Sequence, residues 1–250
     1  MRNDTQSTLV FGTRAIIESI LSGQTVEKVL IANNVNASLH QDLLSLVREK
    51  NIPHSYVPKV KINKLTRRNH QGVVAYLSPI VFAPLSQIVQ TCYEQGKHPL
   101  ILLLDGVTDV RNFGAIVRTA TCTAVDAIVI PSRRSAAVSG AAMKTSAGAL
   151  AYLPICRVDN LKAAMHYLQA SGLQVIACHE KAGSTLYQTN LDMPLAILLG
   201  AEDHGISPQH LKVANKHMQI PIWGPITSLN VATAAAVVLY EHIRQQKFRV

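Results

Sequence analysis

The stretch LILLLDGVTDVRNFGAIVRTA, residues 100–120, decides how the rest of the chain is interpreted. Its first residues, Leu100 to Leu104, form a continuous apolar run, which is typical of a strand buried on both faces of a parallel sheet. A polar turn follows Asp105, and a helical pattern runs from Phe113 to Thr123. Asn112 is suited to cap that helix, because Asn is favoured at the N-cap. The stretch therefore predicts a strand, a turn and a helix.

The same alternation of strands and helices is expected toward the C-terminus. Apolar runs predict further strands at residues 127–130, 173–178, 195–199 and 218–222, and helical patterns predict helices at residues 160–170, 208–214 and 229–246. Strands that alternate with helices favour a mostly parallel sheet covered on both faces. The fold class is therefore α/β.

A smaller α/β unit is expected before this domain. Helical spacing follows Gly12, a strand is expected at residues 26–32, an amphipathic helix at 39–47 and a short buried strand at 72–77. Pro79 and Pro84 then favour extended backbone, as in a linker. We expect a first domain at residues 1–78, a linker at 79–90 and a second domain at 91–250.

Composition and charge exclude several classes of protein. Hydrophobic residues make up 48% of the 250 residues, so disorder is not the dominant state. The apolar runs are far shorter than the ~18 residues of a membrane span. Residues 1–7 are polar and unlike a signal peptide, and four scattered cysteines suggest neither disulfides nor a metal site, so we expect a cytoplasmic protein without metal.

A net charge of +9 favours a polyanionic partner, with nucleic acid first, although a merely soluble basic protein would look the same. Residues 1–84 hold ten lysines and arginines against five acids. We define the basic strip as the cationic residues of the stretch 59–70, which contains no acid. It is either a solvated face or a set of phosphate contacts, and its residues are Lys59, Lys61, Lys64, Arg67 and Arg68.

Common catalytic signatures are missing. The chain contains no G-x-G-x-x-G, no P-loop, no H-E-x-x-H and no G-x-S-x-G. Two other stretches stand out. In LGAEDHGISP, residues 199–208, Gly200 and Gly205 bracket Glu202 after a strand, where a ligand can approach the backbone closely. In IPIWGPITSLNVATAAAVVLYE, residues 220–241, a Gly-Pro turn leads to Ser228, which can cap a long helix.

Together, the three stretches resemble the signature motifs of the SpoU-type family of RNA ribose 2′-O-methyltransferases, in the SPOUT superfamily, over residues 100–245. Residues 6–78, with VFGTR at 10–14 and HQGVVA at 70–75, resemble the substrate-binding domain of that family. The domain layout is similar to that of bacterial enzymes that methylate guanosine ribose in large-subunit rRNA. The resemblance implies a C-terminal domain tied in a deep trefoil knot, with S-adenosylmethionine as the cofactor.

The resemblance also implies roles for individual residues. The cofactor would be held, largely through backbone groups, by Leu199, Gly200, Ile220 and Leu229. The catalytic set would be Asn112, Arg118, Glu202, Ser228 and Asn230, and Arg14 would join the basic strip in binding RNA. Arginine holds its proton to very high pH, so Arg118 is better suited to orient a phosphate and stabilise charge than to act as the base. An RNA phosphate is the alternative base.

Assembly and substrate follow from the same resemblance. We expect a homodimer through the C-terminal domain, with Ala232, Ala235, Ala236 and Leu239 available for close packing. Alternatives to an rRNA enzyme are a tRNA methyltransferase, an rRNA methyltransferase that confers antibiotic resistance, and a non-catalytic RNA-binding module. A silent module would have no need for the five polar residues of the catalytic set.

Overall fold

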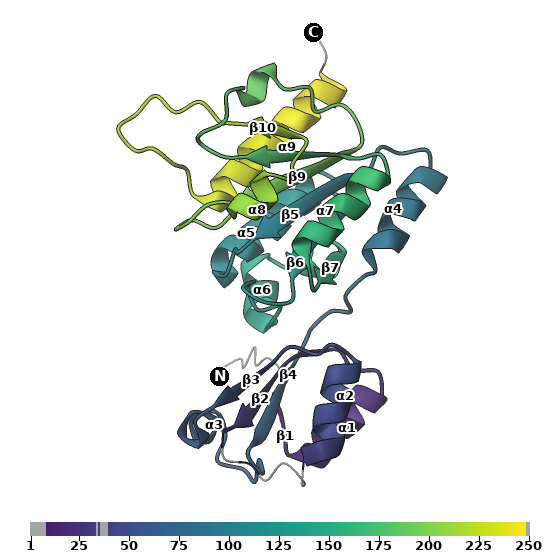
Figure 1. Ribbon diagram of the computed structural model, residues 1–250, viewed down its shortest axis with the longest axis vertical. Helices are drawn as coiled ribbons and strands as arrows, with labels where there is room; N and C mark the ends of the chain where they lie inside the picture. The colour runs from purple at the N-terminus through teal and green to yellow at the C-terminus, as the bar shows by residue number, and fades with distance from the viewer. Residues whose placement is uncertain (1–8, 34, 36–39, 249–250) are drawn as a thin grey trace. The chain divides into compact units, whose positions relative to one another are not determined.

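The computed structural model describes residues 9–248 except 34 and 36–39 (Figure 1). Residues 1–7, expected not to be a signal peptide, and Leu39, the expected start of a helix, lie outside the described residues. The chain divides into two compact units. One comprises residues 1–81 with 137–141, and the other comprises residues 82–136 with 142–250. Each is described by itself below.

The first unit is a four-stranded sheet with helices on both faces. Its elements are β1 (Leu9–Phe11), α1 (Thr13–Leu21), β2 (Val26–Ala32), α2 (Gln41–Glu49), β3 (His54–Val57), α3 (Lys59–Leu65) and β4 (Val73–Leu77). The strand order is β1-β4-β2-β3, and only β2 and β3 are parallel.

Alternation along the strands divides this unit into two apolar clusters. Ile16 of α1 and Leu43 of α2 pack against one face of the sheet, whereas Ile62 of α3 packs with Leu30 and Val74 against the other. The turn before β4 requires a glycine, because Gly72 has a φ of +80° and a Cβ there would lie 2.5 Å from a Val35 methyl group.

The second unit is built on a six-stranded sheet, all parallel, in the order β10-β8-β9-β5-β6-β7. Its elements are α4 (Leu85–Glu94), β5 (Leu100–Asp105), α5 (Val110–Cys122), β6 (Ala127–Pro131), α6 (Gly140–Thr145), η2 (Ala149–Ala151), β7 (Ile155–Val158), α7 (Leu161–Ala170), β8 (Gln174–Cys178), η3 (Leu186–Gln188), β9 (Leu195–Gly200), α8 (Pro208–Leu211), β10 (Lys216–Met218) and α9 (Val231–Lys247). Helix α6 begins in the segment 137–141 that groups with the first unit.

Helices cover both faces of this sheet, as its apolar strands require. Residues of α4 and α7, including Val89 and Met165, form one core cluster with β5, β6, β8 and β9. Helices α5 and α9 pack against each other, and α9 also contacts β9. Their buried residues, including Phe113 and Val238, lie outside that cluster and cover the other face. All six residues of β5 are buried, as expected for a central strand.

Several boundaries differ from the sequence-based expectation. Helix α5 begins at Val110 with Asp109 as its cap, and not at Asn112, because the Asp109 carboxylate accepts from the Arg111 N–H at 2.6 Å. Helix α9 is capped by Asn230 and not by Ser228. Helix α4 starts at Leu85, inside the stretch expected as a linker. Helix α8 ends at Leu211, and β10 covers residues 216–218 and not 218–222.

Among the described residues, no helix combines the length and apolar character that a membrane crossing requires. The same residues contain no group of three or more histidines, cysteines or acids placed to hold a metal ion.

Candidate functional site

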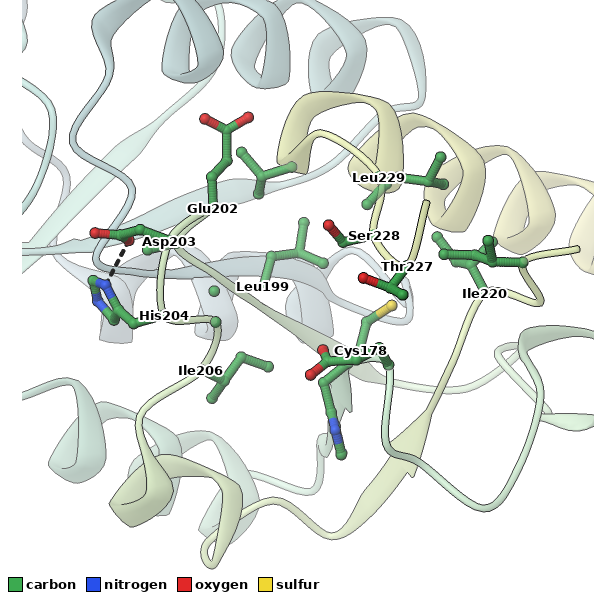
Figure 2. Close-up of a pocket in the computed structure, with 18 residues that line it drawn as sticks. Cys178, Leu199, Glu202, Asp203, His204, Ile206, Ile220, Thr227, Ser228 and Leu229 are labelled. Carbon is green, nitrogen blue, oxygen red and sulfur yellow. Dashed lines mark ion pairs between the residues drawn. The ribbon is translucent and has the colours of Figure 1, made fainter. Parts of the chain in front are cut away.

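A cavity of about 350 Å³ opens where three neighbouring strands end. Strands β10, β8 and β9 lie side by side, and the loops that leave their carboxyl ends supply its walls. In open parallel sheets, ligands bind outside these carboxyl ends. Figure 2 shows Leu199, Thr227, Ser228 and Ile220 around the shared space, with Cys178 beside them.

The loop after β9 turns back sharply on itself. Ala201 and Gly205 exchange two backbone hydrogen bonds, of 3.1 and 3.0 Å. Gly200 makes this possible, because a Cβ at that position would lie 2.2 Å from the carbonyl carbon of Gly205 and 2.3 Å from the Ile206 nitrogen. The close return holds Glu202 at the tip of the loop, beside the cavity.

A buried carboxylate fixes the far end of that loop. Oδ2 of Asp105, the last residue of β5, accepts hydrogen bonds from Ser207 N at 2.8 Å, from Ser207 Oγ at 2.6 Å and from His210 Nδ1 at 2.7 Å. Burial alone would raise the pKa of Asp105, but these hydrogen bonds outweigh it, so the pKa of Asp105 lies below its usual value. An ionised Asp105 therefore ties α8 and the Glu202 loop to the central strand.

Asn230 forms hydrogen bonds with two other polar residues at the rim of the cavity. Its Oδ1 accepts from the N–H groups of Ala232 and Thr233 and so caps α9. Its Nδ2 donates to Oδ1 of Asn112 at 3.1 Å and to Oε1 of Glu202. Three residues of the expected catalytic set, from α5, the β9 loop and the start of α9, thus form one hydrogen-bonded cluster, which we call the rim cluster.

Arg118 lies outside this cluster. It is exposed on α5, and its side chain makes no hydrogen bond or ion pair with another described residue. The arginine electrostatically linked to Glu202 is Arg111, whose guanidinium pairs with Asp109 at 3.0 Å. Asp109 and Glu202 both raise the pKa of Arg111. Within one chain, the structure therefore brings Asn112, Glu202 and Asn230 together and leaves Arg118 free.

The expected cofactor residues Leu199, Gly200, Ile220 and Leu229 all line the cavity, and so do Glu202 and Ser228. The sequence offered no motif for the third wall, which the loop after β8 provides with Cys178, His179 and Glu180. Its only signal was the position of these residues at the carboxyl end of a predicted strand.

The β8 loop is fixed by a pair of histidines. Nε2 of His179 shares a hydrogen bond of 2.9 Å with Nδ1 of His217, a residue of β10, and the rings meet edge to face. Burial, and then the charge of His217, lowers the pKa of His179. Burial raises the pKa of the neighbouring Cys178 thiol to about 12. Both side chains are therefore neutral around pH 7.

In the first unit, the basic strip lies on α3 and the turn that follows. All five of its side chains are exposed, and Arg68 stacks over the Phe11 ring at 5.5 Å. Buried His70 holds this turn, because it bonds to Asn63 Oδ1 and to Gly72 N, each at 2.9 Å. Arg14 is exposed on α1, across the sheet from α3, and pairs with Glu18 at 3.3 Å.

The lining of the cavity indicates what it can bind. Leu199, Ile220 and Leu229 give it an apolar wall, and loop backbone and hydroxyl groups add hydrogen-bonding positions. Its acidic lining residues are Glu180, Glu202 and Asp203, of which Asp203 pairs with His204 (Figure 2). A ligand that combines a flat heterocycle with positive charge suits this set. The fold and the site thus define an α/β protein whose strand-end cavity is suited to a nucleoside-like cation.

Comparison with known proteins narrows this class. Residues 99–240 match the model of the SpoU rRNA Methylase family, and residues 9–82 match a model for RNA 2′-O ribose methyltransferase substrate binding. The chain is 33% identical, over 96% of each chain, to a Staphylococcus saprophyticus protein assigned to the TrmH family of tRNA/rRNA methyltransferases. A Staphylococcus aureus protein of the same assignment is 32% identical, over 96% of this chain and 97% of its own.

Solved structures share the fold. The SpoU methyltransferase AviRb from Streptomyces viridochromogenes, in complex with AdoMet, aligns with a TM-score of 0.61 at 24% identity, covering 95% of this chain and 90% of its own. An AdoMet-bound rRNA methyltransferase from Sinorhizobium meliloti aligns with a TM-score of 0.60 at 22% identity, covering 99% of this chain and 90% of its own.

The chain belongs to the SpoU rRNA methylase family. It is an S-adenosylmethionine-dependent RNA methyltransferase with an RNA substrate-binding domain before the methylase domain. The cavity fits this cofactor, because adenine suits the apolar wall and the acids of the lining suit the positive charge of a sulfonium.

Proposed function

We propose that this enzyme methylates the ribose 2′-hydroxyl of a guanosine in large-subunit ribosomal RNA. The observation that carries the proposal is the rim cluster beside the cavity, where Asn112, Glu202 and Asn230 meet. Amide and carboxylate groups of this kind bind and orient a hydroxyl. The match of residues 9–82 to a ribose methyltransferase substrate-binding model supports the 2′-hydroxyl as the acceptor.

The chain's own residues would act as follows. S-adenosylmethionine, when bound, supplies a methyl group on positively charged sulfur. Leu199, Gly200, Ile220 and Leu229 would hold this cofactor, with Ser228 shaping the same loop. The rim cluster would position the ribose, and Glu202 would favour the positive charge that the cofactor brings. The 2′-hydroxyl is a weak acid and must lose its proton as it attacks.

Arg118 would complete the site from a second copy of the chain. It is unpaired and exposed on α5, which packs beside α9. Two residues expected to face the second copy, Ala235 and Leu239, are instead fully buried in their own chain. The exposed side of α9 carries Thr233 and Tyr240, and we propose the homodimer contact there. Arg118 would then bind an RNA phosphate at the partner's site and stabilise charge, with that phosphate as base.

The preference for rRNA over tRNA rests on the first unit. A solved structure that concerns 2′-OH methylation of C/U34 on tRNA matches 61% of this chain but 99% of its own, with a TM-score of 0.55. Because almost all of that chain aligns with 61% of this one, it is too short to contain counterparts of both units. The first unit, with its exposed basic strip, would contact the phosphates of a folded rRNA segment. A cytoplasmic location follows from this substrate.

Purified protein and radiolabelled S-adenosylmethionine test the proposal on unmethylated rRNA and tRNA. We expect label in 2′-O-methylguanosine from large-subunit rRNA. Arg118→Ala should abolish turnover and leave cofactor affinity nearly unchanged, and Arg118→Lys should also be poor, because an ammonium does not replace a planar guanidinium. An Arg118→Ala enzyme with most of its activity would refute the role of this residue, and label found only in tRNA would refute the substrate.

Light scattering tests the dimer separately. A dimeric mass at the concentration of the assay is expected. Mixing Arg118→Ala chains with Asn230→Ala chains should restore activity. In each mixed dimer, one of the two sites would combine an intact Asn230 from the first chain with an intact Arg118 from the second. A monomer with full activity would refute the shared site.

A further inference from the structure

The loop between β10 and α9 exposes the single tryptophan of the chain. Trp223 is 95% exposed, and Ile222, Ile226 and Leu229 of the same loop are also exposed. Figure 1 shows this segment projecting from its unit. Tryptophan carries a large apolar surface, so an indole left in water at a functional loop indicates a partner that covers it.

Both ends of this loop are fixed at the candidate site. Gln219 N donates to Ser184 O at 2.9 Å, and Gln219 O accepts from Leu186 N at 2.8 Å. At the other end, Asn230 belongs to the rim cluster. Ile222 on one side of Trp223, and Thr227 to Leu229 on the other, line the cavity. Trp223 therefore lies on the chain between two groups of cavity-lining residues.

Residues 178–180, 199–206 and 220–234 include every residue that lines the cavity, and Trp223 is the only tryptophan, tyrosine or phenylalanine among them. The other exposed tyrosine and phenylalanine side chains of the second unit are not among the residues that line the cavity: Tyr93, Tyr152, Tyr167, Tyr187, Tyr240 and Phe248. A ribose placed at the rim cluster carries a base with two flat faces. Stacking of such a base on an aromatic side chain contributes about 1–3 kcal/mol and tolerates any base.

We propose that Trp223 is a stacking platform for a nucleobase of the RNA substrate, either the target base or its immediate neighbour. This inference rests on the proposed function. RNA is favoured over a second copy of the chain because the loop mixes its apolar residues with exposed Gly224, Pro225, Thr227 and Ser228. A second copy of the chain is better matched by the surface of helices α5 and α9, which are 13 and 17 residues long.

The single tryptophan makes the contact directly observable. With excitation at the red edge of the indole band, the emission of the intact protein reports Trp223 alone. We expect the emission of a water-exposed indole in free protein, and quenching by an unmethylated large-subunit rRNA transcript. The quenching should saturate at the same RNA concentration as filter binding.

Variants separate stacking from other effects. Trp223→Ala should weaken RNA affinity and raise the KM for RNA about 5- to 160-fold, the range that 1–3 kcal/mol converts to, with a smaller effect on kcat. Trp223→Phe should retain most of the affinity. Tyr152→Ala is the matched control, because Tyr152 is 82% exposed but lies before β7, at the opposite edge of the sheet. It should leave RNA affinity unchanged.

Three results would overturn the proposal. One is wild-type RNA affinity in Trp223→Ala. Another is equal loss in Trp223→Ala and Tyr152→Ala. The third is an emission maximum that is already blue-shifted without RNA, does not change when RNA is added and shifts to longer wavelength when the protein is diluted. That result would place Trp223 between two copies of the chain. If RNA quenches Trp223 but the wild-type enzyme methylates no ribose, the stacking contact is supported and the proposed function is refuted.

Discussion

The tie between Asp105 and the Glu202 loop makes a sharp prediction for Asp105→Asn. The substitution keeps the shape of the side chain and removes its charge. With the amide oxygen at the position of Oδ2, all three hydrogen bonds persist but change from charge-assisted to neutral. A hydrogen bond to a charged group contributes about 1 kcal/mol more than a neutral one, so we expect a loss of about 2–3 kcal/mol in the free energy of unfolding.

Two assays measure this loss. For a unit of this size the loss corresponds to a fall in Tm of about 4–12 °C. Calorimetry should show S-adenosylmethionine binding weakened about 3- to 10-fold, because Ser207 no longer fixes the end of the loop that bears Glu202, and each 1.4 kcal/mol of loop disorder lowers affinity tenfold. Asp159→Asn is the control. Asp159 also follows a strand, but it is exposed and accepts one side-chain hydrogen bond, from Ser132 Oγ at 2.8 Å.

The pH dependence follows from the same contacts. The pKa of Asp105 is lower in the folded chain than in the unfolded chain, so its stabilisation is present above the unfolded pKa of about 4 and is lost as pH falls through the folded pKa. Acid should therefore destabilise the wild type more than Asp105→Asn below about pH 4. An Asp105→Asn variant that has the Tm and the cofactor affinity of the wild type, and that loses stability below about pH 4 as the wild type does, would refute the reasoning.

Three further predictions concern other parts of the chain. Gly200→Ala should destabilise the protein by about 1–3 kcal/mol and weaken S-adenosylmethionine binding, because its Cβ would overlap Gly205, and a binding isotherm equal to that of the wild type would contradict this. Lys61→Gln with Lys64→Gln should flatten the log–log salt dependence of RNA affinity by up to about 0.9 per lost phosphate contact, and an unchanged slope would exclude the strip from the RNA interface. At about pH 8, iodoacetamide should modify exposed Cys122 before Cys178, whose half-buried thiol has a pKa of about 12, and mass spectrometry showing the reverse order would contradict this.

The central strands could be predicted from sequence because burial on both faces leaves a continuous apolar run. Leu100–Leu104 and Leu195–Leu199 became β5 and β9, which pair in register. The apolar run at residues 218–222 led to the wrong prediction of a strand there, because apolar residues also line cavities. The strand ends at Met218, and Ile220 and Ile222 face the cavity.

Helix caps and the third wall of the cavity required the structure. Asn112 and Ser228 are good cap residues, but Asp109 and Asn230 are equally good, and propensity cannot choose between candidates two or three residues apart. Cys178 and His179 join the site only because β8 lies between β9 and β10. Sequence spacing does not reveal that order. Helical periodicity likewise marked Ala235 and Leu239 as available for packing but not which partner covers them.

Ribose-methylation mapping of total RNA, from cells with the protein and from cells without it, tests the central claim most directly. The account predicts one guanosine in large-subunit rRNA whose 2′-O-methyl group disappears with the protein and returns with the wild-type chain, but not with Arg118→Ala. Identical maps from the two kinds of cell, or a lost methyl group that belongs to a base, would contradict it.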